Sequence, residues 1–282
     1  MSTQQYSYEY YNVTFPAEHV AHVEINRPQK LNAFIEVMWL NLCAIFQRLS
    51  HEPDVRCIVL TGAGDRVFTA GLDVQAASTS GALAPGSMNA DGARTATSIR
   101  RHILEFQDCI TAIEKCEKPV ISVLHGISFG LGMDISLAAD IRLCAASTKF
   151  SVKEADIGLA ADIGTLSRLP KAVASFSWVK DVCMTARIFG ADEALRVGLV
   201  SEVLESKARA VERAVEIASL IGAKSPVAVQ GTKEVLNYSR DHSVNEGLNY
   251  VAVWNSAMLQ TQDVKDAMTA GLQKRTPKFS KL

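Results

Sequence analysis

The chain lacks long apolar runs, and its charges almost cancel. No apolar stretch in its 282 residues approaches the roughly 18 residues of a membrane-spanning helix, so we expect no membrane span. The 29 Lys and Arg residues stand against 30 Asp and Glu residues, which gives a formal net charge of −1. Binding to a phosphate backbone requires clustered Lys and Arg, so nucleic acid is not expected as the main partner. Residues 1–15 lack the basic and apolar regions of a secretory signal peptide.

Cysteines at metal-binding or redox spacing are also missing. No CxxC pair occurs, and most of the cysteines lie in apolar segments, which is typical of buried free thiols in a reducing compartment. We therefore expect no disulfide and no zinc or other metal site. The six cysteines are Cys43, Cys57, Cys109, Cys116, Cys144 and Cys183.

Glycine motifs that bind nucleotides are incomplete. The loop at residues 61–73 begins with GxG after an apolar run, but Val67 stands where a dinucleotide-binding loop has its third glycine. No phosphate loop ending in GKS or GKT occurs. Rossmann and P-loop sites are therefore disfavoured.

Apolar runs alternate with helical patterns over the first two-thirds of the chain. Residues 22–25 alternate as a half-buried strand does, whereas residues 57–60 and 120–124 are continuous apolar runs, typical of strands covered on both faces. Strands separated by helices predict an α/β fold with a largely parallel sheet. The apolar residues at helical spacing are Met38, Leu42, Ile45 and Leu49, then Ile99, Ile103, Phe106, Ile110 and Ile113.

Two segments depart from this alternation. Residues 76–97 are small and polar with little to bury, so we expect a long mobile loop, either a lid or pocket wall or a plain insertion. From residue 206 the pattern is helical, with helices expected over residues 227–239 and 245–272. The sequence thus predicts a core at residues 1–205 and a helical segment at 206–282 that packs on the core or on another subunit.

A second glycine-containing loop covers residues 125–134. Its glycines allow a tight turn and a close approach to a ligand. The apolar run that follows can begin a helix whose first N–H groups have no internal partner, and such donors suit an anion or a developing oxyanion. A tight strand-to-helix turn without a ligand explains this pattern equally well.

Three acidic residues lie in apolar or small-residue surroundings after this loop: Asp134, Glu154 and Asp162. Burial would raise the pKa of such carboxyl groups towards neutral pH, where they can take a proton from one carbon and return it to another. The alternative is that they are solvated, or that they pair with Lys153 or Arg168. The residues alone do not decide between these interpretations.

The last three residues, Ser280-Lys281-Leu282, match the C-terminal tripeptide that the peroxisomal import receptor reads. Such a signal requires an exposed terminus and implies nothing about the fold. We expect a peroxisomal protein that binds this receptor, and an accidental end to a basic tail is the alternative.

The stretch from Val23 to Leu199 resembles the enoyl-CoA hydratase/isomerase (crotonase) family nearly throughout. Four segments in the family's order and spacing carry the resemblance. They are Asn26-Arg27-Pro28 with Lys30-Leu31-Asn32-Ala33; Phe68-Thr69-Ala70-Gly71-Leu72-Asp73; Lys118-Pro119-Val120 through Asp140-Ile141-Arg142; and Ala191-Asp192-Glu193-Ala194 with Gly198-Leu199-Val200.

The resemblance implies a spiral of ββα units, with C-terminal helices that support homotrimers or homohexamers. It implies that the backbone N–H groups of Leu72 and Leu131 form an oxyanion hole for an acyl-CoA thioester, with no cofactor apart from the coenzyme A of the substrate. Where the family has three consecutive glycines, this chain has Gly130-Leu131-Gly132, so a leucine side chain must find room. The implied substrate-binding residues are Lys30, Asn32, Ala33, Ala70, Gly71, Leu72, Asp73, Val74, Gly130, Leu131 and Gly132.

The three acids resemble those of one branch of the family. Hydratases of the family carry glutamates at positions 134 and 154 and a small residue at 162, whereas Asp134 with Asp162 is similar to the Δ3,5-Δ2,4-dienoyl-CoA isomerases of fatty-acid β-oxidation. Their reaction shifts a proton from C2 to C6, which requires two separated acid/base groups. We expect Glu154 to serve C2, Asp162 to serve C6 and Asp134 to orient the pair, although the reverse polarity is also consistent. The alternatives are a 2-enoyl-CoA hydratase, a Δ3-Δ2-enoyl-CoA isomerase and a non-catalytic acyl-CoA binder.

Overall fold

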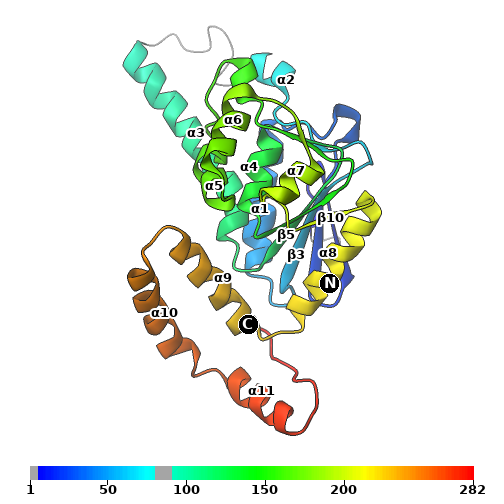
Figure 1. The fold of residues 1–282 in the computed structure, drawn as a ribbon, viewed down its shortest axis with the longest axis vertical. Helices are drawn as coiled ribbons and strands as arrows, with labels where there is room; N and C mark the ends of the chain where they lie inside the picture. The colour runs from blue at the N-terminus through cyan, green and yellow to red at the C-terminus, as the bar shows by residue number, and fades with distance from the viewer. Residues whose placement is uncertain (1–5, 80–90) are drawn as a thin grey trace.

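Two β-sheets organise the computed structural model, which describes residues 6–79 and 91–282 (Figure 1). The larger sheet has the order β1-β2-β3-β5-β7-β10, and the smaller has the order β4-β6-β8-β9. The strands are β1 (Tyr11–Ala17), β2 (Val20–Ile25), β3 (Cys57–Gly62), β4 (Val67–Thr69), β5 (Val120–Leu124), β6 (Ile127–Phe129), β7 (Ile141–Ala145), β8 (Lys149–Ser151), β9 (Phe189–Gly190) and β10 (Glu202–Leu204).

The strand pairing is mostly parallel, as the sequence predicts. In the larger sheet only β1 and β2 run antiparallel, with Val13 opposite Val23, while the remaining neighbours are parallel, with Ile58 opposite Val120. In the smaller sheet β4, β6 and β8 are parallel. The strands expected at 22–25, 57–60 and 120–124 are confirmed as parts of β2, β3 and β5.

Each step of the spiral consists of a strand in the larger sheet, a strand in the smaller sheet and then a helix. The sets β3-β4-α3, β5-β6-α4 and β7-β8-α5 follow this order, which confirms the expected spiral of ββα units. The helices are α1 (Glu36–Ser50), α2 (Val74–Thr79), α3 (Gly92–Lys115), α4 (Leu131–Ala138), α5 (Thr165–Ala172), α6 (Phe176–Thr185), α7 (Ala191–Arg196), α8 (Lys207–Gly222), α9 (Pro226–Arg240), α10 (Val244–Met258) and α11 (Gln262–Leu272), with short 3-10 helices η2 (Pro28–Lys30) and η3 (Glu154–Ile157).

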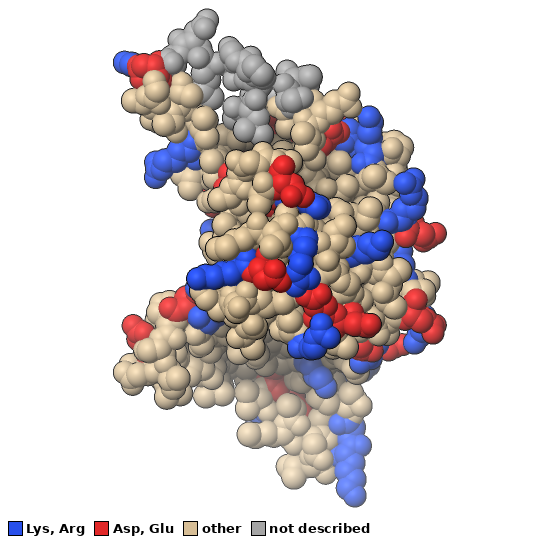
Figure 2. All heavy atoms as spheres, turned by 45° about the horizontal axis from the view of Figure 1, so that its top comes forward, with Lys and Arg blue, Asp and Glu red and all other residues tan. Residues whose placement is uncertain are grey.

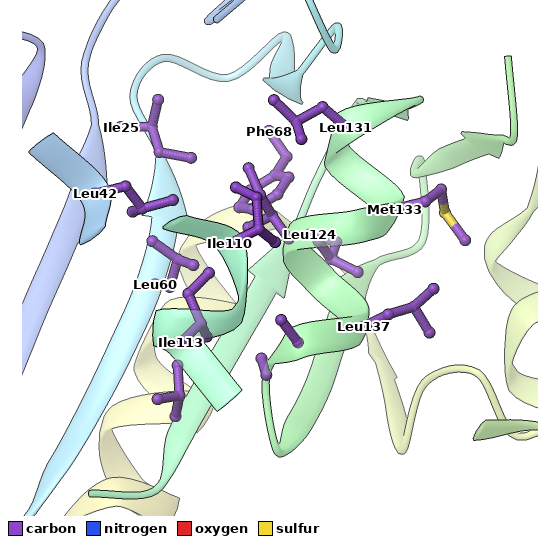
Figure 3. Packing of buried hydrophobic residues seen from close by; sticks show 14 of the residues in the cluster. Ile25, Leu42, Leu60, Phe68, Ile110, Ile113, Leu124, Leu131, Met133 and Leu137 are labelled. Atoms are coloured by element: carbon purple, nitrogen blue, oxygen red, sulfur yellow. The ribbon is translucent and has the colours of Figure 1, made fainter. Parts of the chain in front are cut away.

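Helices cover both faces of the larger sheet, which explains its continuous apolar strands. On one face α1 and α3 bring side chains such as Leu42 and Ile110 next to strand residues such as Leu60, and α4 lies beside α3 (Figure 3). On the other face α8 packs small residues against Val59 and Ile121: Ala210, Ala214 and Ala218. Helix α8 belongs to the segment 206–282, for which packing on the core is one of two expectations, and it packs on the core.

The loop expected at residues 76–97 is wrong at both ends. Helix α2 extends to Thr79, and α3 already begins at Gly92, while residues 80–90 lie outside the described part. The Asp91 side chain accepts hydrogen bonds from the N–H groups of Ala93 and Arg94, both at 3.0 Å, and so caps α3. Small polar residues thus form the exposed first turns of a helix whose later turns pack on the core.

Helices α9, α10 and α11 form an arm that stands away from the body in Figure 1. The helix expected over 227–239 is confirmed as α9, but the one expected over 245–272 is two helices. The break occurs at Thr261, whose side chain accepts a hydrogen bond from the N–H of Asp263 at 3.3 Å and caps α11.

The surface charge is mixed, as the nearly balanced composition predicts. On the face in Figure 2, Lys and Arg side chains are interspersed with Asp and Glu side chains and do not form patches of one sign. Within residues 6–79 and 91–282, no helix has the length and apolar character needed to cross a bilayer. The six cysteines are free thiols, four of them buried and Cys43 and Cys183 half-buried.

Asn32 fixes the loop between β3 and β4. Its buried Nδ2 lies 3.0 Å from the carbonyl oxygen of Ala63, 3.2 Å from that of Val67 and 3.1 Å from that of Phe68. Its Oδ1 accepts a hydrogen bond from the Arg27 N–H at 2.9 Å. One fully buried amide therefore joins the segment before α1 to both sides of a turn that leads into the smaller sheet.

Replacing Asn32 by Ala leaves these buried backbone groups without their partner, so we expect the free energy of unfolding to fall by about 3 kcal/mol. Urea unfolding followed by circular dichroism measures this loss. Asn41→Ala is the matched control, because Asn41 makes one exposed hydrogen bond to the Glu9 carbonyl, and its effect should stay within about 0.5 kcal/mol. Equal effects of the two substitutions would contradict this role of Asn32.

Candidate active site

A cavity of about 590 Å³ collects all three acidic side chains that the sequence singles out. Asp134, Glu154 and Asp162 line it together with both glycine-containing loops. Its remaining wall is largely apolar and comes from the first turn of α1, from α2 and α3, and from residues 157–163. Residues far apart in the sequence therefore meet in one concave site of the size that small ligands occupy.

The first loop presents a free backbone donor at Leu72. The Phe34 N–H donates to the Gly71 carbonyl at 2.8 Å, and the Asp73 N–H donates to the Phe34 carbonyl at 2.9 Å. These bonds hold the loop on both sides of Leu72, whose own N–H donates to no acceptor within the described residues. The donor is thus fixed in place and available to a ligand.

The two loops touch through their backbones. A Cβ added to Gly71, whose φ is +100°, would lie 3.0 Å from the Phe129 carbonyl oxygen and 3.6 Å from the Leu131 nitrogen. A side chain at this position would separate the loops, so glycine is required both for the conformation and for the close approach. The contact places the N–H groups of Leu72 and Leu131 beside the same cavity.

The second loop ends at the N-terminus of α4, as the sequence predicts. The Gly130 N–H donates to the Ser151 carbonyl at 3.0 Å, and the helix begins with Leu131, whose N–H has no acceptor among the residues described. First-turn amides of a helix favour negative charge. The Leu131 side chain is only 4% exposed and packs in the core near Phe68 (Figure 3), so the leucine finds its room there.

Asp134, one turn into α4, is buried and held by α5. Its Oδ1 accepts hydrogen bonds from the Thr165 N–H at 2.6 Å and from the Thr165 hydroxyl at 2.8 Å. Burial raises the pKa of Asp134 to about 6, although these hydrogen bonds and the charge of Arg168 act in the opposite direction. The predicted rise in pKa is therefore supported for this residue.

Glu154 opens η3 and faces the second loop. Its Oε1 would lie 3.3 Å from a Cβ on Gly130, and its Oε2 is buried without a hydrogen-bond partner in the described structure. Burial, then the nearby charge of Asp134, raises the pKa of Glu154 to about 7. Glu154 as a whole is half-buried, and a carboxyl group that is half ionised near neutral pH is suited to exchange protons with a bound substrate.

Asp162 lines the cavity but is exposed, so the prediction of three buried carboxylates is wrong for this residue. It lies in the irregular stretch between η3 and α5. The alternative in which these acids form ion pairs with Lys153 or Arg168 is not observed in the described structure. Lys153 pairs with Asp156 at 2.7 Å, and Arg168 pairs with Glu114 at 2.8 Å.

The predicted substrate-binding residues separate into two groups. Those that line the cavity come from the two loops: Ala70, Gly71, Leu72, Asp73, Val74, Gly130 and Leu131. Asn32 and Gly132 are instead buried in the scaffold, since the Asn32 amide is occupied by backbone groups and a Cβ on Gly132 would lie 3.1 Å from Ser128 Oγ. Lys30 is exposed and Ala33 half-buried, and neither belongs to the cavity lining.

The apolar wall was not identified as part of the site from the sequence. Trp39 of α1 stacks on Phe106 of α3 with ring centroids 4.0 Å apart, and His102 meets the Trp39 ring edge-on at 6.2 Å. Ile103 continues the wall along α3. Phe106 and Ile103 belong to the periodic apolar pattern of that helix, but periodicity does not distinguish a residue that faces the core from one that faces a cavity.

The Glu154 carboxyl should lose its proton as the pH rises through about 7. Because its pKa is raised above the ordinary 4.5 in the folded protein, the neutral form contributes stability that is lost as the pH rises between these values. Infrared difference spectroscopy should show a protonated-carboxyl band with this midpoint, absent from Glu154→Gln. Ionisation complete well below that midpoint would refute the burial argument.

Comparisons with known proteins agree with this geometry. The family model described as "Enoyl-CoA hydratase/isomerase" matches residues 16–281. The mitochondrial Delta(3,5)-Delta(2,4)-dienoyl-CoA isomerase of Rattus norvegicus is 46% identical over 280 residues, which is 98% of this chain and 84% of the relative. The peroxisomal Delta(3,5)-Delta(2,4)-dienoyl-CoA isomerase of Arabidopsis thaliana is 44% identical over 263 residues and 93% of each chain.

Solved structures share the architecture over almost the whole chain. An enoyl-CoA hydratase from Bacillus anthracis superposes with a TM-score of 0.85 at 26% identity, covering 96% of this chain and 99% of the other. A putative enoyl-CoA hydratase from Streptomyces coelicolor A3(2) gives a TM-score of 0.85 at 28% identity, with 97% and 95% covered. The family match and the long, similar relatives lead to one conclusion: the chain belongs to the enoyl-CoA hydratase/isomerase family.

Proposed function

We propose that this protein is a Δ3,5-Δ2,4-dienoyl-CoA isomerase of fatty-acid β-oxidation. The observation that carries the proposal is that two separate acids, Glu154 and Asp162, line one cavity with two free backbone donors. Relatives with this activity in their names, similar over almost the full chain, support it.

The donors stabilise the charge that develops during the reaction. The thioester carbonyl oxygen accepts hydrogen bonds from the N–H groups of Leu72 and Leu131 as an enolate forms. Each such donor typically contributes on the order of 3 kcal/mol to the transition state. The apolar wall at Trp39 and Phe106 faces the acyl chain and keeps water from the reacting carbons.

Two carboxyl groups each transfer one proton. Ionised Glu154 takes a proton from C2, and the electrons of that C–H bond shift the double bonds from positions 3 and 5 towards positions 2 and 4. Protonated Asp162 donates a proton to C6, which completes the conjugated product. The charge of Asp134 helps to keep the pKa of Glu154 high.

The substrate test compares 3,5-dienoyl-CoA with 2-enoyl-CoA on the wild-type protein. Isomerisation of the dienoyl ester creates a diene conjugated with the thioester and therefore an absorbance at longer wavelength. Loss of the enoyl absorbance with 2-enoyl-CoA alone would identify a hydratase instead. Binding of both esters without conversion would identify a non-catalytic binder.

Asp162→Asn should abolish isomerisation while leaving binding of the CoA ester nearly intact, because the amide cannot supply the second proton. Absorbance assays and calorimetric titration measure the two properties. Asp156→Asn is the matched control, because Asp156 is an exposed acid of η3 that pairs with Lys153 and lies outside the cavity lining. Equal activity of the Asp162 variant would refute its role.

The arm is proposed to assemble copies of the chain into homotrimers or pairs of trimers. Large apolar side chains stand exposed on its helices, including Leu236, Leu248 and Val253, with Val253 exposed at 72%. Exposed apolar surface of this extent is typical of protein–protein interfaces. A second copy supplies the same apolar surface, as closed symmetric assembly requires.

The C-terminal tripeptide is proposed to direct the protein to peroxisomes through the import receptor. The tail lies against the body, where the Arg56 guanidinium donates to the carbonyl oxygens of Phe279 at 2.8 Å and Ser280 at 3.2 Å. Lys281 forms an ion pair with Asp54, and Leu282 remains 56% exposed. Although Arg56 is buried, residues 280–282 are themselves exposed, which leaves the tripeptide accessible to a receptor.

Deleting Ser280 to Leu282 should move the protein from peroxisomes to the cytosol. The measurement is the fluorescence of an N-terminal reporter fusion in cells that lack an endogenous copy, so that co-import with an intact subunit is excluded. Asp54→Asn is the control, because it loosens the tail but keeps the signal. Peroxisomal fluorescence from the truncated protein would overturn the proposal.

A further inference from the structure

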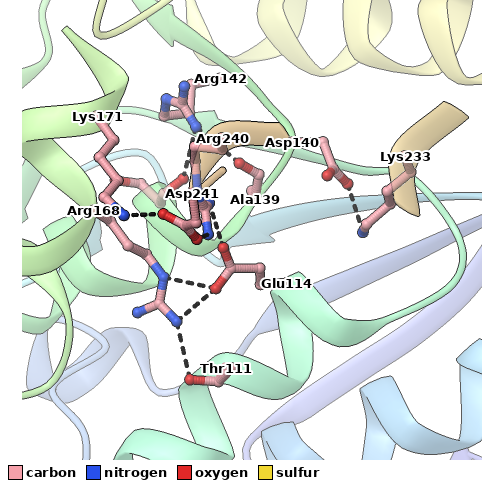
Figure 4. Close-up of polar contacts among 11 residues, drawn as sticks. Thr111, Glu114, Ala139, Asp140, Arg142, Arg168, Lys171, Lys233, Arg240 and Asp241 are labelled. Atoms are coloured by element: carbon pink, nitrogen blue, oxygen red, sulfur yellow. Dashed lines mark hydrogen bonds and ion pairs between the residues drawn. The ribbon is translucent and has the colours of Figure 1, made fainter. Parts of the chain in front are cut away.

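A polar stripe on α3 faces residues 162–168, the segment that carries Asp162 and Thr165, the hydrogen-bond partner of Asp134. Gln107, Thr111 and Glu114 are spaced four and three residues apart, which places them on one side of the helix. Gln107 Nε2 donates to the Asp162 backbone carbonyl at 2.5 Å. Thr111 and Glu114 both contact Arg168 of α5 (Figure 4). The stripe therefore holds residues 162–168 at both ends.

Arg168 is held by several bonds at once. Its Nε and Nη2 donate to Glu114 Oε2 at 2.9 Å and 2.8 Å, and Nη2 also donates to Thr111 Oγ1 at 2.9 Å. Arg240 of α9 forms an ion pair with the same glutamate (Figure 4). The Arg168 and Glu114 side chains are only 12% and 14% exposed, so their geometry is well defined.

The Arg168 guanidinium contacts the turn at Gly164, which precedes Thr165, the hydrogen-bond partner of Asp134. A Cβ on Gly164 would lie 2.0 Å from Arg168 Nη1, so the guanidinium rests directly on the glycine backbone. The next residue, Thr165, donates two hydrogen bonds to Asp134. Arg168 thus contacts Gly164, the residue next to the hydrogen-bond partner of Asp134. Gln107 binds the backbone of Asp162, two residues before Gly164.

We propose that Arg168 and Gln107 are positioning residues for isomerisation. Arg168, fixed by Thr111 and Glu114, sets the turn at Gly164 and through Thr165 the orientation of Asp134. Gln107 fixes the backbone of Asp162, so that its carboxyl group meets the distal carbon of the acyl chain. Neither residue lines the cavity, so each acts through the acid that it positions. The inference rests on the proposed isomerase function.

The test measures kcat and KM for 3,5-dienoyl-CoA with Arg168→Met, Arg168→Lys and Gln107→Met. We expect kcat to fall on the order of 100-fold in Arg168→Met and Gln107→Met, because small displacements of catalytic groups carry losses of this size. KM should stay near the wild-type value, since the loops that bind the thioester are untouched. Arg168→Lys keeps the charge but not the set of directed donors, so it should restore kcat only in part.

Lys171→Met is the matched control. Lys171 lies one turn beyond Arg168 on α5 and pairs with Asp241 at the end of α9 (Figure 4). Within the described part of the chain, no hydrogen bond or ion pair joins the Lys171 side chain to Gly164 or to an acid of the cavity. Its kcat should equal that of the wild type. Thermal unfolding of every variant separates folding from positioning, and the half-exposed Gln107 tests the idea even if Arg168→Met fails to fold.

The outcomes are distinguishable. Wild-type protein that does not convert 3,5-dienoyl-CoA would refute the proposed function. Active wild-type protein together with unchanged kcat in folded Arg168→Met and Gln107→Met would overturn the positioning role alone. Full recovery of kcat in Arg168→Lys would show that charge suffices, and it would also overturn the geometric role.

Discussion

The candidate site depends on the backbone contact between the two glycine-containing loops. Gly71 lies close enough to the Phe129 carbonyl that even a methyl group would force the loops apart. This contact sets the separation of the Leu72 and Leu131 N–H groups, and it brings the smaller sheet next to the start of α4. The first two turns of the spiral each contribute one of the two loops that meet at this contact.

Much of the fold could be predicted because local patterns and tertiary environment agree. The apolar runs at 57–60 and 120–124 are buried on both faces between α8 and the α1, α3 and α4 layer, so composition alone indicates their environment. The errors arose where polar residues form helices. Asp91 caps α3 in a stretch that composition assigned to a loop, and Thr261 begins a new helix inside a pattern that suggested one.

The sequence predicted which acidic residues belong to the site, but not how exposed each of them is. Asp134, Glu154 and Asp162 line one cavity, yet Asp134 is buried, Glu154 is half-buried and Asp162 is exposed. Their exposure depends on what packs around them from α4, α5 and η3, which neighbours in sequence do not reveal. The same limit explains Asn32, whose sequence motif indicated a ligand contact although its amide is consumed by the backbone. It also explains Trp39, whose ring closes the cavity from a helix that looked purely structural.

Both proposed oxyanion donors, the N–H groups of Leu72 and Leu131, belong to the main chain, and this changes how the site responds to sequence variation. Substituting the side chain of Leu131 alters core packing, because that side chain is buried with Phe68, but it leaves the N–H in place. Alanine substitution at these positions would therefore change stability but would not reveal the role of the backbone N–H group. Only a change to the peptide unit itself, such as replacing the amide by an ester, removes the donor. The side chains at positions 72 and 131 can consequently change during evolution, while the N–H group proposed to stabilise the enolate is inherited with the fold.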